Sequence, residues 1–335
     1  MRTERTSGCP ALADERGGAL LLVLWLVAAL SAIAFSVAHR VRAETDRVST
    51  ALDGVRAYYL ATGAIDRTLL YMQWGPRYTL PDGSSRYYSP WMTRLVLNFP
   101  AGEATVEIVP ESSKLNINTA SLDELYRLLM ALGAGPERAR LIAQAVLDWR
   151  TPKPEEEMSP FDRYYLSLSP SFRAPHASFE EIEELLLVQG MTPELFYGNY
   201  VRDSTGRLVR GGALRDCVSV WGSGGAVDVN TAPPAVLVAV GLRPETVASV
   251  VQARSVRPFR TAEQIAALGL APGQGAERLR IGGGSIFTLK ATARLKAGEG
   301  NLSDLKRSVA AIVKIGVSGD KQYRILRWQE NAWAE

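Results

Sequence analysis

The chain offers few side chains of the kinds that carry out catalysis. Its 335 residues include only two histidines, His39 and His176, and two cysteines, Cys9 and Cys217. Zinc clusters and disulfide scaffolds need more of these residues than the chain has. His176 follows a proline and has no Ser or Cys nucleophile motif nearby, which favours a histidine in a surface loop over the base of a catalytic triad. We therefore expect a protein that is not an enzyme and has no catalytic residue.

Phosphate-binding chemistry has little more support. The three glycines at 282–284 lack the Lys-Ser/Thr pair of a nucleotide-binding loop and precede an expected strand, so they are interpreted as a linker. Lys and Arg total 38 and Asp and Glu 35, a net charge of +3, which is far from the excess of a polybasic nucleic-acid binder. Apolar residues make up 47% of the chain, which is typical of folded domains. The length suits two or three of them.

One motif occurs twice and predicts an internal repeat. Asn116-Ile117-Asn118-Thr119-Ala120 recurs as Asp228-Val229-Asn230-Thr231-Ala232. Each copy continues with an expected helix, a glycine turn, a second helix that ends in an arginine and a third helix opened by a capping box. The expected third-helix caps are Ser178 and Thr261, and Ser121 with Glu124 forms a further box. The first copy is the longer one, largely through residues 151–177.

These small helical units resemble SAM-like or helix-hairpin-helix modules, many of which hold a DNA phosphate on the backbone amides of a Gly-x-Gly turn. The first copy has such a turn in Gly133-Ala134-Gly135, whereas the second copy lacks the second glycine. From Lys114 to Trp149 the acidic and basic side chains balance, which predicts weak phosphate affinity. We therefore favour a packing role for the repeats and keep DNA binding as the alternative.

An uncharged segment near the N-terminus predicts one membrane span. It runs from Ala19 to Ala38, about the length needed to cross a bilayer core as a helix. A secretory signal peptide cleaved near Ala34 is the alternative, but no turn follows the apolar run. Apolar side chains then recur every three or four residues, so the helix continues until Gly75-Pro76. This stripe is the expected partner-binding face, and it includes Val48, Leu52, Val55, Tyr59, Ile65 and Leu69.

The segment Arg16-Gly17-Gly18-Ala19-Leu20-Leu21-Leu22-Val23 resembles the processing site of type IV pilin-like proteins. The resemblance implies cleavage by a prepilin peptidase after Gly17, with Gly18 as the alternative cut site. Most members of that family have a glutamate at the fifth mature position, where it pairs with the terminal amine of the subunit above. By this count the position is Leu22, which implies a subunit that needs no neighbour above it.

Alternating apolar and polar residues predict five strands on either side of the repeats. The expected strands are residues 92–99, 104–110, 285–295, 305–315 and 322–328. The fold class is therefore α+β: a pilin-like long N-terminal helix packed on an antiparallel sheet, with a large all-α insertion of two units. The expected segments are 1–17 (leader), 18–76 (long helix), 77–110 (first strands), 111–225 and 226–284 (helical units) and 285–335 (last strands).

The order of these features resembles the K-type minor pseudopilins of type II secretion, the general secretion pathway protein K family. The likeness also rests on the run Ser178-Phe179-Glu180-Glu181-Ile182-Glu183-Glu184-Leu185 and on the ending Tyr323-Arg324-Ile325-Leu326-Arg327-Trp328. It implies a non-enzymatic protein, held in the inner membrane by a single span with its soluble domain in the periplasm. Its expected place is the tip of the pseudopilus, where it helps to initiate assembly for protein export, and its expected partners are the I-type and J-type minor pseudopilins.

The resemblance leaves the metal question open. Relatives can carry calcium near the helical domain, and the natural oxygen ligands here would be the acids of the inserted loop. These are residues 155–157, all glutamates, and Asp162, which we interpret as a solvated acidic loop. No cofactor is certain, calcium is an open possibility, and the metal ligands are unknown.

Overall fold

The computed structural model describes residues 16–74, 77–81, 83, 85–154, 156–202, 206–222, 225–269, 275–297, 301–316 and 322–330. The chain divides into two compact units, residues 1–56 and 57–335. Helix α1 (Arg16–Trp74) contributes to both of them. Its end at Trp74 agrees with the predicted end at Gly75-Pro76, whereas residues 1–15 of the predicted leader lie outside the described residues.

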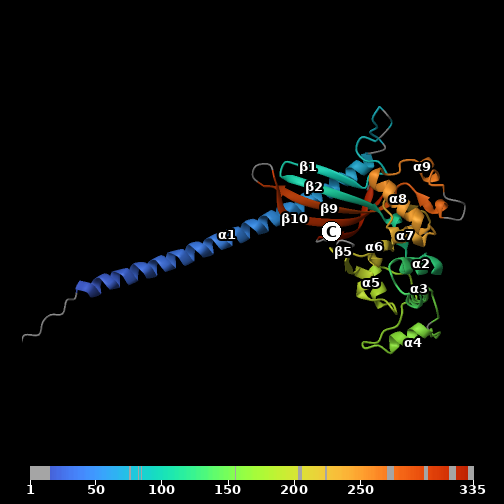
Figure 1. Cartoon of the computed structure of the whole chain (residues 1–335), viewed down its shortest axis with the longest axis horizontal. Coiled ribbons are helices and arrows are strands. Elements are labelled where there is room, and N and C mark those ends of the chain that lie inside the picture. Colours follow the sequence, from blue (N-terminus) through green and yellow to red (C-terminus); the bar gives the residue numbers. More distant parts are fainter. Residues whose placement is uncertain are drawn as a thin grey trace, which may run out of the picture. The chain divides into compact units, whose positions relative to one another are not determined.

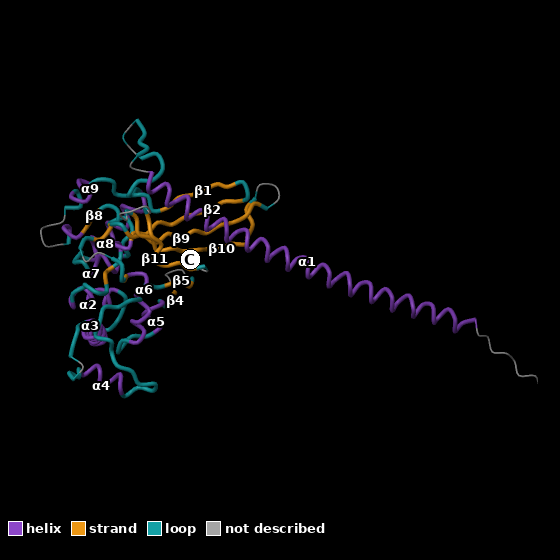
Figure 2. The backbone as a smooth tube through the Cα atoms, turned by 180° about the vertical axis from the view of Figure 1, so that it is seen from behind, coloured by secondary structure: helices purple, strands orange, loops and turns teal. Residues whose placement is uncertain are grey.

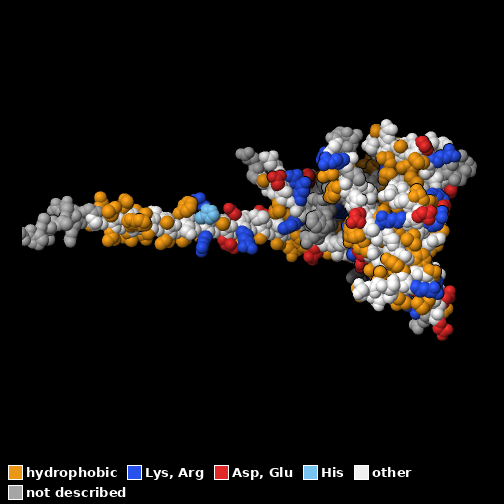
Figure 3. Space-filling view, turned by 60° about the horizontal axis from the view of Figure 1, so that its bottom comes forward, with side chains coloured by type: hydrophobic (Ala, Val, Ile, Leu, Met, Phe, Trp, Pro, Cys, Tyr) orange, Lys and Arg blue, Asp and Glu red, His pale blue; other side chains and the backbone are white. Residues whose placement is uncertain are grey.

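In the first unit, α1 is apolar on all sides over its early turns. The side chains from Leu20 to Val37 that are large and apolar are more than half exposed, and no acid or base interrupts them. Figure 3 shows these apolar side chains together, with charged side chains only further along the helix. Among the described residues, α1 is the one helix long and apolar enough to cross a membrane. A helix that is apolar all round is suited to lipid rather than to water.

The second unit is built on a five-stranded antiparallel sheet (Figure 1). Its strands are β1 (Arg94–Phe99), β2 (Gly102–Pro110), β9 (Ile286–Lys296), β10 (Leu302–Ile315) and β11 (Tyr323–Gln329). Their spatial order is β1-β2-β9-β10-β11, so β2 and β9 are neighbours although the helical segment separates them in the sequence. The five predicted strands and the antiparallel sheet are confirmed.

One face of this sheet packs against the last part of α1. Strand β9 alternates buried and half-buried residues along its length, which is the period of a strand with one covered face. Ala57, Ala61 and Ala64 of α1 are fully buried, and their small side chains let the helix backbone approach the sheet closely. Ile65 and Leu69 fill the space beside them, at 0% and 1% exposure. Burial of this apolar surface stabilises the unit, because it removes hydrocarbon from water.

The helical segment lies between β2 and β9 and contains two copies of one arrangement (Figure 2). The first copy comprises η1 (Glu111–Ser113), β3 (Leu115–Asn116), α2 (Leu122–Ala131), α3 (Pro136–Arg150), α4 (Pro160–Leu166), η2 (Ile182–Leu187), α5 (Pro193–Tyr197), β4 (Tyr200–Arg202), β5 (Leu208–Arg210), α6 (Leu214–Cys217) and β6 (Val218–Ser219). The second comprises β7 (Val227–Asp228), α7 (Pro234–Ala239), α8 (Pro244–Val256), α9 (Ala262–Ala266), η3 (Ala276–Arg278) and β8 (Leu279–Arg280). Each copy is closed by a two-residue parallel pair, β3 with β6 and β7 with β8.

The third helix of the first copy differs from the prediction. It is a short 3-10 helix, η2, that begins four residues after Ser178. Its cap is formed by Glu184, whose Oε1 accepts from the backbone N–H groups of Glu180 (2.7 Å) and Glu181 (2.9 Å). The predicted cap at Ser178 is therefore wrong, whereas those at Thr261 and Ser121 are confirmed. The error arose because Ser178 offers a serine with an acid three residues later, the same signature at the wrong register.

Candidate functional site

The second asparagine of each motif copy ties the start of its unit to the start of the third helix. Asn118 accepts from the N–H of Phe179 (2.7 Å) and donates to its carbonyl (3.0 Å). Asn230 makes the same two bonds to Phe259, at 2.8 and 2.9 Å. The amide side chain offers one acceptor and two donors, so it pairs with a peptide unit as another peptide would. The two equivalent asparagines thus connect the same two segments in both copies.

The arginine that ends the second helix completes the same clamp. Arg254 donates to the carbonyls of Val229 (2.9 Å) and Ala232 (2.8 Å), which flank the turn of the second motif. Arg150 donates to the equivalent carbonyls of the first motif. A guanidinium can serve two carbonyls at once because its donors are fixed in one plane. The arginine of each copy therefore supplies hydrogen bonds to two carbonyls of the turn that have no partner within a helix.

The first residue of the motif differs between the copies and plays two different roles. Asn116 accepts from the N–H of Asn118 (2.9 Å) and donates to the carbonyl of Gly222. Asp228 accepts from the hydroxyl of Thr231 and from the N–H of Gly282 (2.8 Å). Burial raises the pKa of the Asp228 carboxyl above its usual value, although these hydrogen bonds oppose the rise.

The threonines of the motif are not equivalent. Thr231 donates to Asp228, whereas Thr119 is exposed on the surface of the first copy. The side chains of Asn116, Asn118, Asp228, Asn230 and Thr231 thus all form hydrogen bonds within the helical segment. This is typical of a packing motif rather than of a ligand site.

The Gly-x-Gly turn of the first copy and the corresponding turn of the second both lead into helix starts that disfavour phosphate binding. The turn leads into α3, whose first turn holds Pro136 and Glu137, and the equivalent turn of α8 holds Pro244 and Glu245. Proline has no N–H to offer, and a glutamate at this end of a helix repels phosphate. Arg138, the nearest base, donates instead to the carbonyl of Gly190 (2.9 Å) and to the hydroxyl of Thr192 (2.8 Å).

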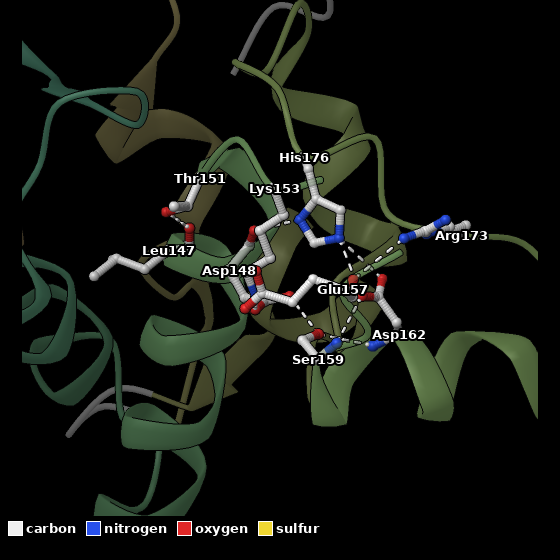
Figure 4. Close-up of polar contacts among 9 residues, drawn as sticks. All are labelled: Leu147, Asp148, Thr151, Lys153, Glu157, Ser159, Asp162, Arg173 and His176. Atoms are coloured by element: carbon white, nitrogen blue, oxygen red, sulfur yellow. Dashed lines mark hydrogen bonds and ion pairs between the residues drawn. The ribbon is translucent and has the colours of Figure 1, made fainter. Parts of the chain in front are cut away.

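Acidic and basic side chains gather where the inserted loop meets the end of α3 (Figure 4). Asp148 of α3, Asp162 of α4 and His176 lie close enough for their ligand atoms to fall within 4.8 Å of one another. The Lys153 ammonium binds Asp148 Oδ1, and the Ser159 hydroxyl donates to Asp148 Oδ2 at 2.9 Å. His176 Nε2 is 3.1 Å from both oxygens of Asp162. The cluster is therefore a closed set of charge-assisted hydrogen bonds.

The position of Asp162 and His176 corrects two expectations. Asp162 is fully buried and the His176 side chain is only 7% exposed, so neither belongs to a solvated surface loop. Burial by itself raises the pKa of the Asp162 carboxyl, but the Ser159 N–H (2.9 Å) and His176 outweigh it and hold that pKa below its usual range. Glu156 and Glu157 are exposed as expected, and residue 155 lies outside the described residues.

A second buried acid joins the sheet to the helical segment. Glu111 is 2% exposed, and its carboxylate accepts from Lys114 (3.0 Å) and from the hydroxyls of Ser219 in β6 and Thr288 in β9. Burial opposes ionisation, but these three donors hold the Glu111 pKa below its usual value. Sequence reasoning missed this residue, because its partners are distant in the chain and no local pattern connects them.

The predicted partner-binding face of α1 is only partly available. Val48, Leu52, Val55 and Tyr59 are about half exposed or more, with values of 57, 48, 51 and 67%. Ile65 and Leu69 lie in the core against the sheet of the same chain, so their assignment to a partner-binding face is wrong. The stripe runs continuously along the helix, and its periodicity alone does not show where the chain's own sheet begins to cover it.

The predicted processing residues fall at the start of the same helix. Gly17 and Gly18 lie in the first turn of α1, and Leu22 follows one turn later with 70% of its surface exposed. Residues from Arg16 onward are described, whereas residues 1–15 of the predicted leader are outside the described residues.

Comparison with known proteins finds similarity to one protein family over two ranges of the chain. Residues 104–197 and 227–280 each match a family model described as type II secretion system protein K. Together the two ranges cover less than half of the chain, which over these ranges is similar to type II secretion system protein K. The two matched ranges contain both copies of the asparagine clamp, so the family signal coincides with the repeat.

Two individual proteins are similar to the chain in sequence or in fold. The type II secretion system protein K of Klebsiella pneumoniae is 25% identical over 209 residues, which are 54% of this chain and 60% of that protein. The chain thus matches less than two thirds of this relative's length. A chain in the crystal structure of the GspK-GspI-GspJ complex from the enterotoxigenic Escherichia coli type 2 secretion system aligns with a TM-score of 0.55 and 16% identity, covering 86% of this chain and all of that one. This likeness shows the long helix, antiparallel sheet and helices as a shared fold.

The apolar N-terminal part of α1 is compatible with a single-pass membrane anchor.

Proposed function

We propose that this protein is a minor pseudopilin that caps the tip of the type II secretion pseudopilus and helps to initiate its assembly. The observation that carries the proposal is the place of the helical segment. It leaves the sheet at Pro110 and returns at Phe287, which are register partners, so the whole segment is attached at one end of β2 and β9. Within the second unit this is the end towards which α1 runs, beyond Trp74 (Figures 1 and 2).

A helical segment at this end favours a terminal subunit. In a filament whose subunits align their α1 helices, the segment occupies the space into which the next subunit would stack. A cap has no subunit above it and suffers no such clash. Replacing residues 112–284 by a short turn should keep the sheet and the membrane helix while releasing the limit on filament length. Unchanged filament length and unchanged export with this variant would contradict the proposal.

Leu22 supports the same position. A carboxylate at this depth in the membrane helix is costly unless a partner neutralises it. A subunit inside the filament has such a partner in the terminal amine of the subunit above, whereas a tip subunit has none. The apolar Leu22 removes the need for that partner.

The orientation proposed here places the residues after about Arg40 in the periplasm, with cleavage between Gly17 and Gly18 by a prepilin peptidase. N-terminal sequencing of the protein from its host membrane should find Gly18 first, or Ala19 if the cut follows Gly18. A bulky residue in place of Gly17 should block maturation. An N-terminus near Ala34 would instead identify an ordinary secreted protein.

The proposed partners are the I-type and J-type minor pseudopilins, followed by the rest of the pseudopilus. The fold likeness to a chain of the GspK-GspI-GspJ complex supports them. The proposed contact surface is the exposed part of α1, at Val48, Leu52, Val55 and Tyr59. Charged substitutions at Leu52 and Val55 should abolish co-purification of the partners, whereas the same change at Thr50, exposed on the opposite side of the helix, should leave it intact.

The alternative is a membrane-anchored periplasmic DNA-binding protein whose helical units act as SAM-like or helix-hairpin-helix modules. The repeated pair of helices joined by a glycine turn is the observation that favours such modules. Glu137 and Glu245 at the helix starts argue against phosphate binding. We expect no retardation of duplex DNA by the full-length protein at 150 mM salt. Micromolar binding that Gly135→Val abolishes would establish the alternative.

A further inference from the structure

A cavity of about 100 Å³ lies between the edge of the sheet and the helical segment. Strands β10 and β11 form one wall of it, through Ile312 and Leu326, and the helical segment forms the other, through residues that include Ile182 and Val220. Pockets for small molecules usually measure roughly 300 to 1,000 Å³, whereas an apolar cavity of about 150 Å³ holds one benzene. The size therefore suits one side chain of another polypeptide better than a free small ligand.

The strand beside the cavity, β11, has a free edge. It is the last strand of the sheet and pairs only with β10. Within the described part of the chain, no backbone hydrogen bond reaches its outer edge. The N–H and C=O groups along such an edge can pair with an extended segment of another polypeptide.

A β-bulge limits which segments can pair with this edge. Leu326 is the extra residue of the bulge, because its two neighbours in β11 pair with consecutive residues of β10. A bulge interrupts the regular ladder and turns the side chain of the extra residue, and Leu326 lines the cavity. An arbitrary strand therefore finds an irregular edge, and a segment that binds here needs a further contact. The cavity beside Leu326 provides one.

The mouth of the cavity carries an excess of negative charge. Glu180 and Glu181 line it, and Glu183 and Glu184 follow directly in η2. The cation that faces them is Arg327, whose guanidinium lies 3.6 Å from the Glu181 carboxylate and 3.5 Å from that of Glu183. Four carboxylates against one guanidinium attract a positively charged group and repel an acidic one.

The other charged groups of this region do not cancel the excess. Lys114 lines the cavity, but its ammonium binds the buried Glu111 carboxylate at 3.0 Å, so the pair adds no net charge. Arg324 and Lys314 are register partners on the sheet and do not line the cavity. The carboxylates at the mouth are partly exposed, so their attraction for a cation is moderate and weakens with salt.

The walls suit the hydrocarbon stem of a basic side chain. Lysine and arginine lay their stems along apolar surface while the charged head stays in water or beside an acid. Trp221, which is 37% exposed, also lines the cavity, and an indole ring attracts a cation to its face. The apolar residues of the lining are Ile182, Val218, Val220, Ile312 and Leu326.

We propose that the cavity between β11 and η2 receives a lysine or arginine side chain of a partner polypeptide that lies extended along the free edge of β11. The edge supplies backbone hydrogen bonds, and the acidic mouth selects the basic side chain. This contact is separate from the exposed part of α1 and does not depend on the tip position.

Peptide titration followed by nuclear magnetic resonance tests the contact. Full-length protein in detergent, labelled with ¹⁵N-tryptophan, has one indole at the cavity, Trp221, and one in β11, Trp328. Trp221→Phe and Trp328→Phe assign the two signals. The probe is acetyl-Thr-Val-Lys-Val-Thr-amide, whose valines and threonines favour an extended backbone. It should shift both indoles with one common midpoint.

The matched probe replaces the lysine by acetyl-lysine, which keeps the stem and removes the charge. Its midpoint should be higher by about five-fold. Equal midpoints for the two peptides would overturn the proposal, because they would show that charge is not recognised. A shift of Trp328 without Trp221 would overturn it as well, since the peptide would then bind the edge and leave the cavity empty. The absence of any shift at 10 mM lysine peptide would also overturn it.

A double variant tests the acidic mouth. Glu180→Gln with Glu181→Gln removes two exposed charges, and glutamine can still accept hydrogen bonds. The lysine peptide should bind this variant about five-fold more weakly, and the acetyl-lysine peptide should bind it as before. Glu245→Gln, exposed at the start of α8, is the matched control and should leave both midpoints unchanged. An unchanged midpoint for the lysine peptide in the double variant, or an equal loss in the control, would contradict the proposal.

Discussion

Removal of the first asparagine clamp should destabilise the helical segment by a predictable amount. In Asn118→Ala the N–H and carbonyl of Phe179 lose their partners at 2.7 and 3.0 Å. An unsatisfied buried backbone group costs about 1 to 3 kcal/mol, and half-buried groups are at the lower end because water reaches them. Asn118 is half-buried, so we expect a total loss of about 2 to 3 kcal/mol in the free energy of unfolding. For a unit of this size the melting temperature falls by about 2 to 4 °C per kcal/mol.

The assay is denaturant unfolding of the full-length protein in detergent, followed by circular dichroism and by tryptophan fluorescence. Trp149, in the core of the first copy, is one of the seven tryptophans that contribute to the fluorescence signal. Asn98→Ala is the matched control, since Asn98 is exposed on β1 and no side-chain hydrogen bond is recorded for it in the described part of the chain. A loss in Asn118→Ala no larger than that in Asn98→Ala would refute the clamp. A normal loss in free energy with a changed slope against denaturant would instead indicate that the denatured state had altered.

Three other predictions follow from buried groups and from the membrane helix. Because the Glu111 pKa is lower in the folded protein than its usual value near 4.5, its stabilising effect is present above that value and is lost as pH falls through the lowered one. Glu111→Gln should therefore flatten the loss of unfolding free energy as the pH falls below about 4.5. Arg254→Met should cost about 2 to 4 kcal/mol because two turn carbonyls lose a charged donor, while exposed Arg257→Met should cost under about 0.5 kcal/mol in the same unfolding assay. Leu22→Glu should reduce the yield of the partner complex by several fold in a pull-down, since the tip position offers no amine to the new carboxylate; an unchanged yield would contradict the tip argument.

The sheet and the long helix could be predicted because their signals are local. Alternation of apolar and polar residues shows the strands, and the uncharged run from Ala19 to Ala38 shows the membrane helix. The prediction of one antiparallel sheet interrupted by the helical segment did not specify that β2 pairs with β9. What the pattern of α1 did not show is where one stripe passes from a free surface to the core at Ile65, because the periodicity is the same on both sides.

The repeat could also be found from the sequence, although the hydrogen bonds that its residues form could not. Asn118 and Asn230 stand out by recurrence, but their partners Phe179 and Phe259 lie at different distances along the chain. The insertion in the first copy hides this equivalence from any fixed spacing. The start of the short 3-10 helix after Glu181 was misplaced for a different reason. A serine three residues before an acid has the signature of a helix cap wherever it occurs.

The acidic cluster was the least predictable part. An acid-rich loop with several prolines has the composition of a solvated surface, and nothing in the sequence brings Asp162 to His176 and the end of α3. The loop side chains are buried because they lie against aromatic residues, above all Trp149 and Tyr165. These two residues are separated in the sequence but are in contact in the fold. Sequence-based reasoning therefore identified the loop as acidic and missed that the side chains of Asp162 and His176 are buried.

The most direct test of the account is the position of the protein on assembled pseudopili. A gold label attached to an exposed cysteine introduced into the helical segment, in a Cys217→Ser background, can be counted by electron microscopy along each filament. A tip subunit should give one label at one end of a filament and none along its length. Labels repeated along the filament at the abundance of the main subunit would contradict it.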